Sequence, residues 1–357
     1  MKKSISLVLV FVLALSIEVA EADFTFGTPT NLGPTVNTSV EDGGPSISMD
    51  GLSLYFYSFL SGWGQPTLRV ATRETVEDLW SEAVSLEPPL NGSLGSPCIS
   101  ADGLSLYFDA ELPGGSGGND ICLATRETIS APWGNPVNLG PAVNSSDFDM
   151  GASISSDGLE LYFGSYRPSG SGDWDVWVTT RANISDPWGT AVNLGPTVNS
   201  SGFDGHPGIS PDGLVLFFSS NRAGGYGDWD IWITRRATIN NDWDTPVNLG
   251  PSLNTACGEC EPSFSADGRM LYFSDWMIGR PGGLGTIDLW QVPIVPSVDL
   301  NDDGIIDAAD MCIVVDNWGT DNQLCDVGPM PWGDGIVDVQ DLVVLAEHLF
   351  EEFPPVE

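Results

Sequence analysis

The sequence contains one unit five times. Each copy includes a segment such as PSISMDGLSLYF (45–56) or PGISPDGLVLFF (207–218), in which an Asp-Gly pair separates two short apolar runs. A regular period of this kind indicates a repeat architecture, in which similar small units bury their apolar faces against one another. Five copies must therefore pack side by side. The Asp-Gly pairs are 52 to 55 residues apart and begin at Asp50, Asp102, Asp157, Asp212 and Asp267.

Each unit has the pattern of four β-strands. Its apolar runs are short, alternate with polar residues and are bounded by Gly, Pro, Asn and Asp, which is typical of strands. Asp-Gly between two such runs predicts a tight hairpin. A third run such as DVWVTTR (175–181) and a fourth such as PVNLGP (246–251) complete the unit. Four strands in about 55 residues favour a β-propeller blade over a helical repeat.

The two ends of the repeat region complement each other. The fifth unit stops near 291–295 and lacks its PVNLGP strand, whereas FTFGTPTNLGP (24–34) supplies one ahead of the first unit. Pairing of these segments would remove the exposed edges of an open array. We therefore predict an all-β five-bladed propeller over residues 23–296, closed by its N-terminal strand.

The repeat also resembles a known family. The stretch DGHPGISPDGLVLFFSSNR (204–222) is similar to the TolB-type propeller repeat, which is related to the Trp-Asp repeat propellers. The resemblance extends over nearly the whole ring and implies the propeller fold. It implies no particular activity, because propellers serve in binding, scaffolding and catalysis alike.

Residues 1–22 predict an export signal. Lys2 and Lys3 precede an apolar run over 5–17, and the segment ends in AEA before Asp23. This order of basic, apolar and small residues is typical of a cleaved signal peptide. The apolar run is too short to span a bilayer, which needs about 20 residues. We expect an exported protein, secreted or held at the cell surface, without a membrane span.

Composition restricts the partners of the chain. The formal net charge is −37 at pH 7, and every basic residue after Lys3 is an arginine. A surface this acidic repels nucleic acid and anionic lipid headgroups. The lack of lysine excludes Schiff-base chemistry, and the presence of only two histidines argues against zinc sites and hydrolytic triads. Paired carboxylates remain the catalytic chemistry open to such a chain, and calcium is the cation that it favours.

Six cysteines in an exported chain predict disulfides. Cys257 and Cys260 lie in CGEC, and Cys312 and Cys325 flank a short segment. We expect each of these two pairs to form a bridge, with CGEC as a structural clip rather than a redox motif. Cys98 and Cys122 are the leftover pair.

The segment DLNDDGIIDAAD (299–310) has the order of a calcium-binding loop. Oxygen-bearing side chains recur at alternate positions, a glycine permits the sharp turn and a carboxylate closes the cage. Residues 333–341 repeat the second half of the pattern, and Asp326 is a further candidate across an enlarged excursion. The predicted calcium ligands are Asp299, Asn301, Asp303, Ile305 (through its carbonyl), Asp307 and Asp310, and then Asp326, Asp334, Ile336, Asp338 and Asp341.

The two loop–helix repeats in residues 297–357 resemble a type I dockerin domain. The resemblance implies a small all-α calcium-binding domain that docks onto a cohesin domain of a scaffold protein. It assigns the cohesin contact to loop positions 10 and 11, which are Ala308, Ala309, Val339 and Gln340 in this sequence. The segment has 15 acidic residues and no lysine or arginine, so we expect calcium to be needed for its folding.

Candidate ligand residues fall in the long loops opposite the Asp-Gly hairpins, because tight hairpins leave little room for a site. Acids that recur there, Asp42, Asp149, Asp204 and Glu259, are interpreted as partners of loop amides rather than catalysts. Residues that depart from the repeat are better candidates for ligand binding. Aromatic rings among them either stack on sugars or only cover the loops. The predicted ligand face comprises Trp63, Trp174, His206, Tyr226, Trp229 and Trp276.

Two hypotheses of function follow. In the first, which the sequence favours, the calcium module carries the propeller to a cohesin-bearing scaffold or cell surface, where the propeller binds polysaccharide or protein during polysaccharide breakdown. In the alternative, the propeller is a glycoside hydrolase with catalytic carboxylates at its central mouth. Glu111 and Glu261 are the best unrepeated acids for that role.

Overall fold

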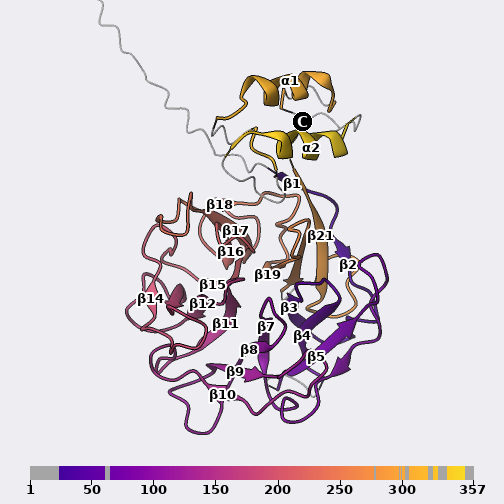
Figure 1. Cartoon of the computed structure of the whole chain (residues 1–357). Helices are drawn as coiled ribbons and strands as arrows, with labels where there is room; N and C mark the ends of the chain where they lie inside the picture. Colours follow the sequence, from indigo (N-terminus) through magenta and orange to yellow (C-terminus); the bar gives the residue numbers. More distant parts are fainter. Residues whose placement is uncertain are drawn as a thin grey trace, which may run out of the picture.

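The protein is an all-β propeller of five blades, with two short helices near its C-terminus (Figure 1). The computed structural model describes residues 24–60, 65–276, 279–296, 298, 300–301, 305–320, 325–328 and 336–349. Blades 1 to 4 are four-stranded antiparallel sheets with their strands in chain order. The predicted all-β five-bladed propeller is therefore confirmed.

The strands of blades 1 to 4 follow the predicted repeat. Blade 1 consists of β3 (Asp42–Ile47), β4 (Ser53–Ser58), β5 (Thr67–Thr72) and β6 (Val84–Ser85). Blade 2 consists of β7 (Gly95–Ile99), β8 (Ser105–Ala110), β9 (Asp120–Thr125) and β10 (Val137–Asn138). Blade 3 consists of β11 (Asp149–Ile154), β12 (Glu160–Ser165), β13 (Asp175–Thr180) and β14 (Val192–Asn193). Blade 4 consists of β15 (Asp204–Ile209), β16 (Val215–Ser220), β17 (Asp230–Arg235) and β18 (Val247–Asn248).

The fifth blade combines strands from both ends of the ring. It contains β19 (Glu259–Phe264), β20 (Met270–Asp275) and the longer β21 (Leu289–Pro296). Two N-terminal strands, β1 (Phe24–Phe26) and β2 (Thr30–Asn31), pair antiparallel with β21. In the β2 pairing, Thr30 lies opposite Gln291 and Asn31 opposite Trp290.

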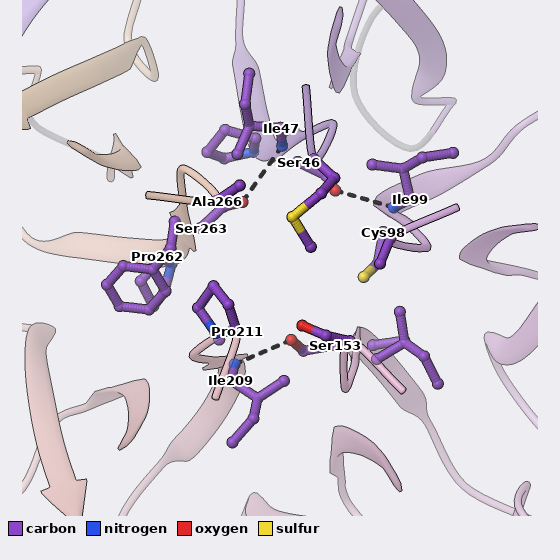
Figure 2. A pocket seen from close by; sticks show the side chains of 18 of the residues that line it. Ser46, Ile47, Cys98, Ile99, Ser153, Ile209, Pro211, Pro262, Ser263 and Ala266 are labelled. Carbon is purple, nitrogen blue, oxygen red and sulfur yellow. Dashed lines mark hydrogen bonds between the residues drawn. The ribbon is translucent and has the colours of Figure 1, made fainter. Parts of the chain in front are cut away.

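The first strands of the blades surround the propeller axis. β3, β7, β11, β15 and β19 contact one another in turn, and β19 contacts β3 to complete the circle. Near the Asp-Gly hairpins, serine side chains on this axis bond to the next blade (Figure 2). Ser46 Oγ accepts from Ile99 N at 3.0 Å, and Ser153 Oγ accepts from Ile209 N at 3.1 Å. The bond from Ile47 N to Ser263 Oγ, at 3.4 Å, joins blade 5 to blade 1.

A separate apolar cluster fills each interface between blades. The cluster between blades 4 and 5, for example, contains Phe217 and Phe264, whose rings meet edge to face with centroids 4.4 Å apart. Apolar burial of this kind is the main force that holds the ring together. Trp177, Trp232 and Trp290 are buried in these clusters and pack between blades.

The acids that recur before the first strand stabilise the loops, as predicted. Asp204 is fully buried and accepts bonds from Ser200 N and Oγ and from Ser220 Oγ. Arg222 Nη2 lies 2.5 Å from its Oδ1. These contacts involve both carboxylate oxygens of Asp204, which therefore stabilises the loop.

The cysteine prediction needs correction, because all six cysteines are free. Cys260 is buried in β19 with its Sγ 3.6 Å from Ser274 Oγ, whereas Cys257 Sγ points to Gly279 O. Cys312 is exposed on the first helix, but Cys325 is buried in the core of the C-terminal segment. A bridge needs side chains that face each other at short range, and neither predicted pair, Cys257–Cys260 or Cys312–Cys325, meets that condition.

The described part of the C-terminal segment contains two helices. They are α1 (Ala308–Asp316) and α2 (Val339–Glu347), and they lie together beyond the end of β21 (Figure 1). Each begins with the same capping box, Asp307 with Asp310 and Asp338 with Asp341, in which side chain and backbone amide bond reciprocally. Neither of these described helices is long and apolar enough to cross a membrane.

Candidate functional site

A β-bulge interrupts the first strand of every blade at the same place. The pairing register with the second strand shifts there, for example between Gly205 and Gly208 in blade 4. The residue inside the bulge has a positive φ in all five blades. These five equivalent positions, which we name the axial ring, are Gly44, Ser96, Gly151, His206 and Glu261, with φ of 63°, 40°, 63°, 47° and 58°.

A cavity of about 710 Å³ opens above the axial ring, on the face opposite the Asp-Gly hairpins. We name it the mouth cavity. Its walls come from all five blades and combine carboxylates, aromatic rings and a histidine. The residues that line it are Tyr57, Phe59, Gln65, Pro66, Ser93, Gly95, Ser96, Asp109, Glu111, Asn119, Met150, Trp174, Phe203, His206, Trp229, Glu261 and Trp276.

Glu261 is a buried carboxylate at the floor of the cavity. Gly44 N donates to its Oε2 at 2.6 Å and Ser274 Oγ at 2.5 Å, while Tyr57 Oη donates to Oε1 at 3.2 Å. Gly44 and Tyr57 belong to blade 1, so the side chain bridges the interface between blades 5 and 1. Three donors fix its orientation and complement its negative charge.

Asp109, in β8 of blade 2, is also buried in the cavity wall. Asn119 Nδ2 donates to its Oδ2 at 2.9 Å, whereas Oδ1 has no hydrogen-bond partner among the described residues. Burial raises the pKa of this carboxyl from 3.8 to about 6, and the negative charge of Glu261 acts in the same direction, against the opposing effects of Ser96, Asn119 and the Gly151 amide. A carboxyl of this pKa carries a proton in mildly acidic solution.

Glu111 completes the carboxylate set. It is exposed at the rim of the cavity, two residues beyond Asp109. None of the described lining residues is a lysine or an arginine. The cavity therefore has a negative potential.

Blades 3 to 5 contribute a row of stacked aromatic rings. Phe203 and Trp229 are nearly parallel with centroids 4.4 Å apart, and Trp229 and Trp276 stack at 5.1 Å. Trp174 follows on the other side of Phe203 at 5.9 Å. We name these four side chains the aromatic row. Because both faces of Trp229 are covered by its neighbours, this ring presents its edge, not its face, to a ligand.

The side chain of His206, a member of the axial ring, lies against the aromatic row. Its imidazole centroid is 5.6 Å from that of Phe203 and 6.1 Å from that of Trp229. Burial lowers the pKa of His206 below its usual 6.5, only partly opposed by the Glu261 charge. The ring is therefore neutral at pH 7 and acts as a hydrogen-bonding group rather than a cation.

The structure brings together most, but not all, of the predicted ligand face. Trp174, His206, Trp229 and Trp276 line the mouth cavity, together with the two predicted acids Glu111 and Glu261. Tyr226 is exposed on the loop between β16 and β17 and is not among the lining residues. Trp63 lies outside the described residues.

Sequence reasoning missed Asp109, Tyr57, Ser96 and Phe203. Aligned on the Asp-Gly pairs, the fifth residue of the second strand is Tyr57, Asp109, Gly164, Ser219 or Ser274 in the five blades. That position faces the bulge and, with the first position, is one of the two least repeated of its strand. A position-by-position alignment of the five units would have exposed Asp109 as a lone acid at this site.

The predicted calcium ligands are only partly described. Asp310 and Asp341 are fully buried, and each accepts two loop amides, from Leu300 and Asp307 in the first case and from Gly328 and Asp338 in the second. Asn301, Ile305, Asp307, Asp326, Ile336 and Asp338 are also described, whereas Asp299, Asp303 and Asp334 are not. The described residues contain no group of three or more His, Cys, Asp or Glu side chains that could hold a metal ion.

No family model and no curated protein matches the sequence. Among solved structures, the chain is similar to the catalytic domain of a GH62 α-L-arabinofuranosidase from Coprinopsis cinerea, with 12% identity over 76% of this chain and 96% of that one and a TM-score of 0.52. An α-L-arabinofuranosidase from Lactobacillus brevis matches with 13% identity over 73% and 92% and a TM-score of 0.51. TolB from Acinetobacter baumannii matches with 18% identity over 72% and 56% and a TM-score of 0.44. At identities this low, the two arabinofuranosidase matches show a shared fold and nothing further.

Proposed function

We propose that the chain is a glycoside hydrolase that acts on polysaccharide at the mouth cavity. The observation that carries the proposal is the position of Asp109, Glu111 and Glu261. None of these acids recurs at the equivalent position of the other blades. They come from two different blades, yet all three line the mouth cavity. Glycoside hydrolysis needs a pair of carboxyl groups with different roles, and Asp109 and Glu261 differ in their hydrogen bonds: Glu261 accepts three, whereas Oδ1 of Asp109 has no described partner. The arabinofuranosidases that share the fold are glycosidases by name, so the proposed activity is one that this fold accommodates.

The environments of the two buried carboxyls suggest their roles. Asp109, whose pKa is raised to about 6, is the proton donor. It gives its proton to the glycosidic oxygen as the bond between that oxygen and the anomeric carbon breaks. Glu261, held by three donors, faces the positive charge that develops on the sugar and takes the proton of the attacking water. Both groups then return to their starting states by proton exchange with solvent.

The test is an assay of the full mature chain on soluble and insoluble polysaccharides, with reducing ends and depletion from solution followed together. Release of reducing ends by the wild type, and none by the Asp109→Asn/Glu261→Gln double variant, is expected. Depletion without release would instead favour the binding function, in which the propeller only holds polysaccharide for other enzymes.

We further propose that β2 closes the ring as the fourth strand of blade 5. Its hydrogen bonds support this, because they match those of the other fourth strands. Asn31 Nδ2 donates to Asp288, as Asn193 Nδ2 does to Asp175. The amide of the residue two positions later bonds to the same asparagine in both blades. β2 and β14, the fourth strand of blade 3, therefore make equivalent hydrogen bonds.

The C-terminal segment is proposed to be a calcium-binding dockerin-like module of an exported protein. The described residues are compatible with calcium: Asp310 and Asp341 are buried carboxyl groups at the starts of the two helices, and no lysine or arginine occurs in 297–357. Asp299, Asn301, Asp303, Asp307 and Asp310 would hold one ion, and Asp326, Asp334, Asp338 and Asp341 a second. Ala308, Ala309, Val339 and Gln340 are exposed at the helix starts, where a cohesin domain would bind.

Calcium is expected to fold this module. Circular dichroism of the fragment 297–357 should gain helical signal when calcium is added, and chelation should reverse the gain, because the bound ion neutralises the buried carboxylates. Magnesium at the same concentration is the control, since it tolerates such large oxygen cages poorly. A spectrum that calcium leaves unchanged would reject the metal assignment.

A further inference from the structure

The axial ring has a property that the repeat does not require. Two of its five left-handed positions carry glycine, whereas Ser96, His206 and Glu261 carry side chains at φ of 40°, 47° and 58°. A left-handed backbone strains any residue with a Cβ atom. Because glycine satisfies the same bulge in blades 1 and 3, the fold itself does not need side chains there. Their presence indicates a role in the cavity that they line.

The space around His206 is matched to its side chain. A Cβ atom added to Gly151, the neighbouring member of the axial ring, would lie 2.8 Å from His206 Cδ2. Glycine at that position therefore leaves the room that the imidazole occupies. His206 lines both the mouth cavity and the narrower space at the axis below it.

Two buried polar atoms in this region have no hydrogen-bond partner among the described residues. They are Nδ1 of His206, from blade 4, and Oδ1 of Asp109, from blade 2. Buried polar atoms in folded proteins almost always have a partner, from protein, water or ligand. An imidazole nitrogen and a carboxyl oxygen are both suited to the hydroxyl groups of a ligand.

The charge of the cavity limits that ligand further. Asp109, Glu111 and Glu261 line it without a described lysine or arginine, so uronic acids and sulfated sugars are repelled. The same carboxylates would attract a cationic amino sugar, so chitosan oligomers are the comparison ligand that tests whether the sugar is uncharged.

We infer that the mouth cavity binds an uncharged, hydroxyl-rich sugar, and that His206 binds one of its hydroxyl groups. This inference rests on the proposed function, since it places a glycan at the same site. It assigns the specificity of the cavity to hydrogen bonds at the axis rather than to ring stacking on Trp229.

The test measures binding and turnover separately in the same samples of the full mature chain. Tryptophan fluorescence reports binding of neutral arabino-, xylo- and cello-oligosaccharides, of oligogalacturonate and of chitosan oligomers, and chromatography reports products. Saturable binding of a neutral oligosaccharide is expected. His206→Gly should bind it about tenfold more weakly while melting at the same or a higher temperature, because glycine relieves the strained backbone. Tyr226→Ala, outside the cavity, is the matched control and should bind as the wild type does.

The outcomes separate the inference from the proposed function. Neutral binding without products keeps the inference and rejects the hydrolase. Binding or turnover only of oligogalacturonate or chitosan oligomers overturns the inference, and so does unchanged affinity in His206→Gly. If the glycine variant does not fold, His206→Asn replaces it, since asparagine tolerates the left-handed region but has a shorter side chain.

Discussion

Asp109→Asn is expected to lower the rate of glycoside cleavage by about 10²- to 10⁴-fold, the usual contribution of a general acid. The same change should make the protein more stable at neutral pH. Asparagine has nearly the shape of aspartate, so the cavity wall is preserved. The substitution removes the proton that the carboxyl supplies. At high pH it also removes the buried negative charge.

The stability effect has a definite direction with pH. Burial raises the pKa of Asp109 from 3.8 to about 6, so the folded state binds this proton more tightly than the unfolded state does. The resulting stabilisation is complete below pH 3.8 and is lost as pH rises through 6. Asparagine cannot ionise. The variant should therefore match the wild type near pH 4 and exceed it at pH 8 by up to about 3 kcal/mol, from a shift of about two units at ~1.4 kcal/mol each.

Thermal melts of both proteins from pH 4 to pH 8 measure this difference, and the pH–rate profile of the wild type complements them, since its activity should fall as pH rises through 6. Asp242→Asn is the control, because Asp242 is exposed and its melts should be unaffected. A melting difference that does not change with pH would reject the assigned ionisation, and full activity in Asp109→Asn would reject its catalytic role.

Removal of residues 23–34 from the mature chain is expected to prevent cooperative folding of the propeller. The deletion takes away β1 and β2, leaves one edge of β21 unpaired and removes Phe26 and Leu32, which pack against the clusters on either side of blade 5. An unpaired edge next to exposed apolar surface favours aggregation. Calorimetry and size-exclusion chromatography measure the loss.

A pair of point variants distinguishes closure of the ring from general damage. If β2 is the fourth strand of blade 5, then Asn31→Ala and Asn193→Ala remove equivalent hydrogen bonds. Both should destabilise the protein by a similar amount, about 1–3 kcal/mol for buried polar partners left unsatisfied. A truncated chain that melts like the intact one would show that the N-terminal strands are dispensable.

The repeat determined how much of the fold was predictable. Strand boundaries followed from the Asp-Gly pairs, because a hairpin turn and alternating apolar residues are local features of the chain. The recurring carboxylate of Asp204 was assigned correctly for a related reason: a residue present in most blades serves what all blades share. The disulfide prediction was wrong because a bridge depends on the direction of each cysteine side chain. That direction differs between a strand such as β19 and the loop before it.

The candidate site was only partly predictable, because it consists of departures from the repeat at positions that converge only in three dimensions. Glu261 was singled out as unrepeated, but its contact with Tyr57 and Gly44 spans the interface between the last and first blades. Asp109 was missed because its strand otherwise follows the pattern. Its raised pKa is a consequence of burial at the axis, which no local pattern reports.

The pairing of β1 and β2 with β21 has a consequence for the order of events during synthesis. β1 and β2 are synthesised first, but they cannot pair until β21 has been synthesised. More than 250 residues separate Thr30 from its partner Gln291. Contacts so distant in sequence form slowly. Glu261 bonds to Gly44 and Tyr57 across the interface between blades 5 and 1, so the mouth cavity is complete only after the first strands of the fifth blade have been synthesised.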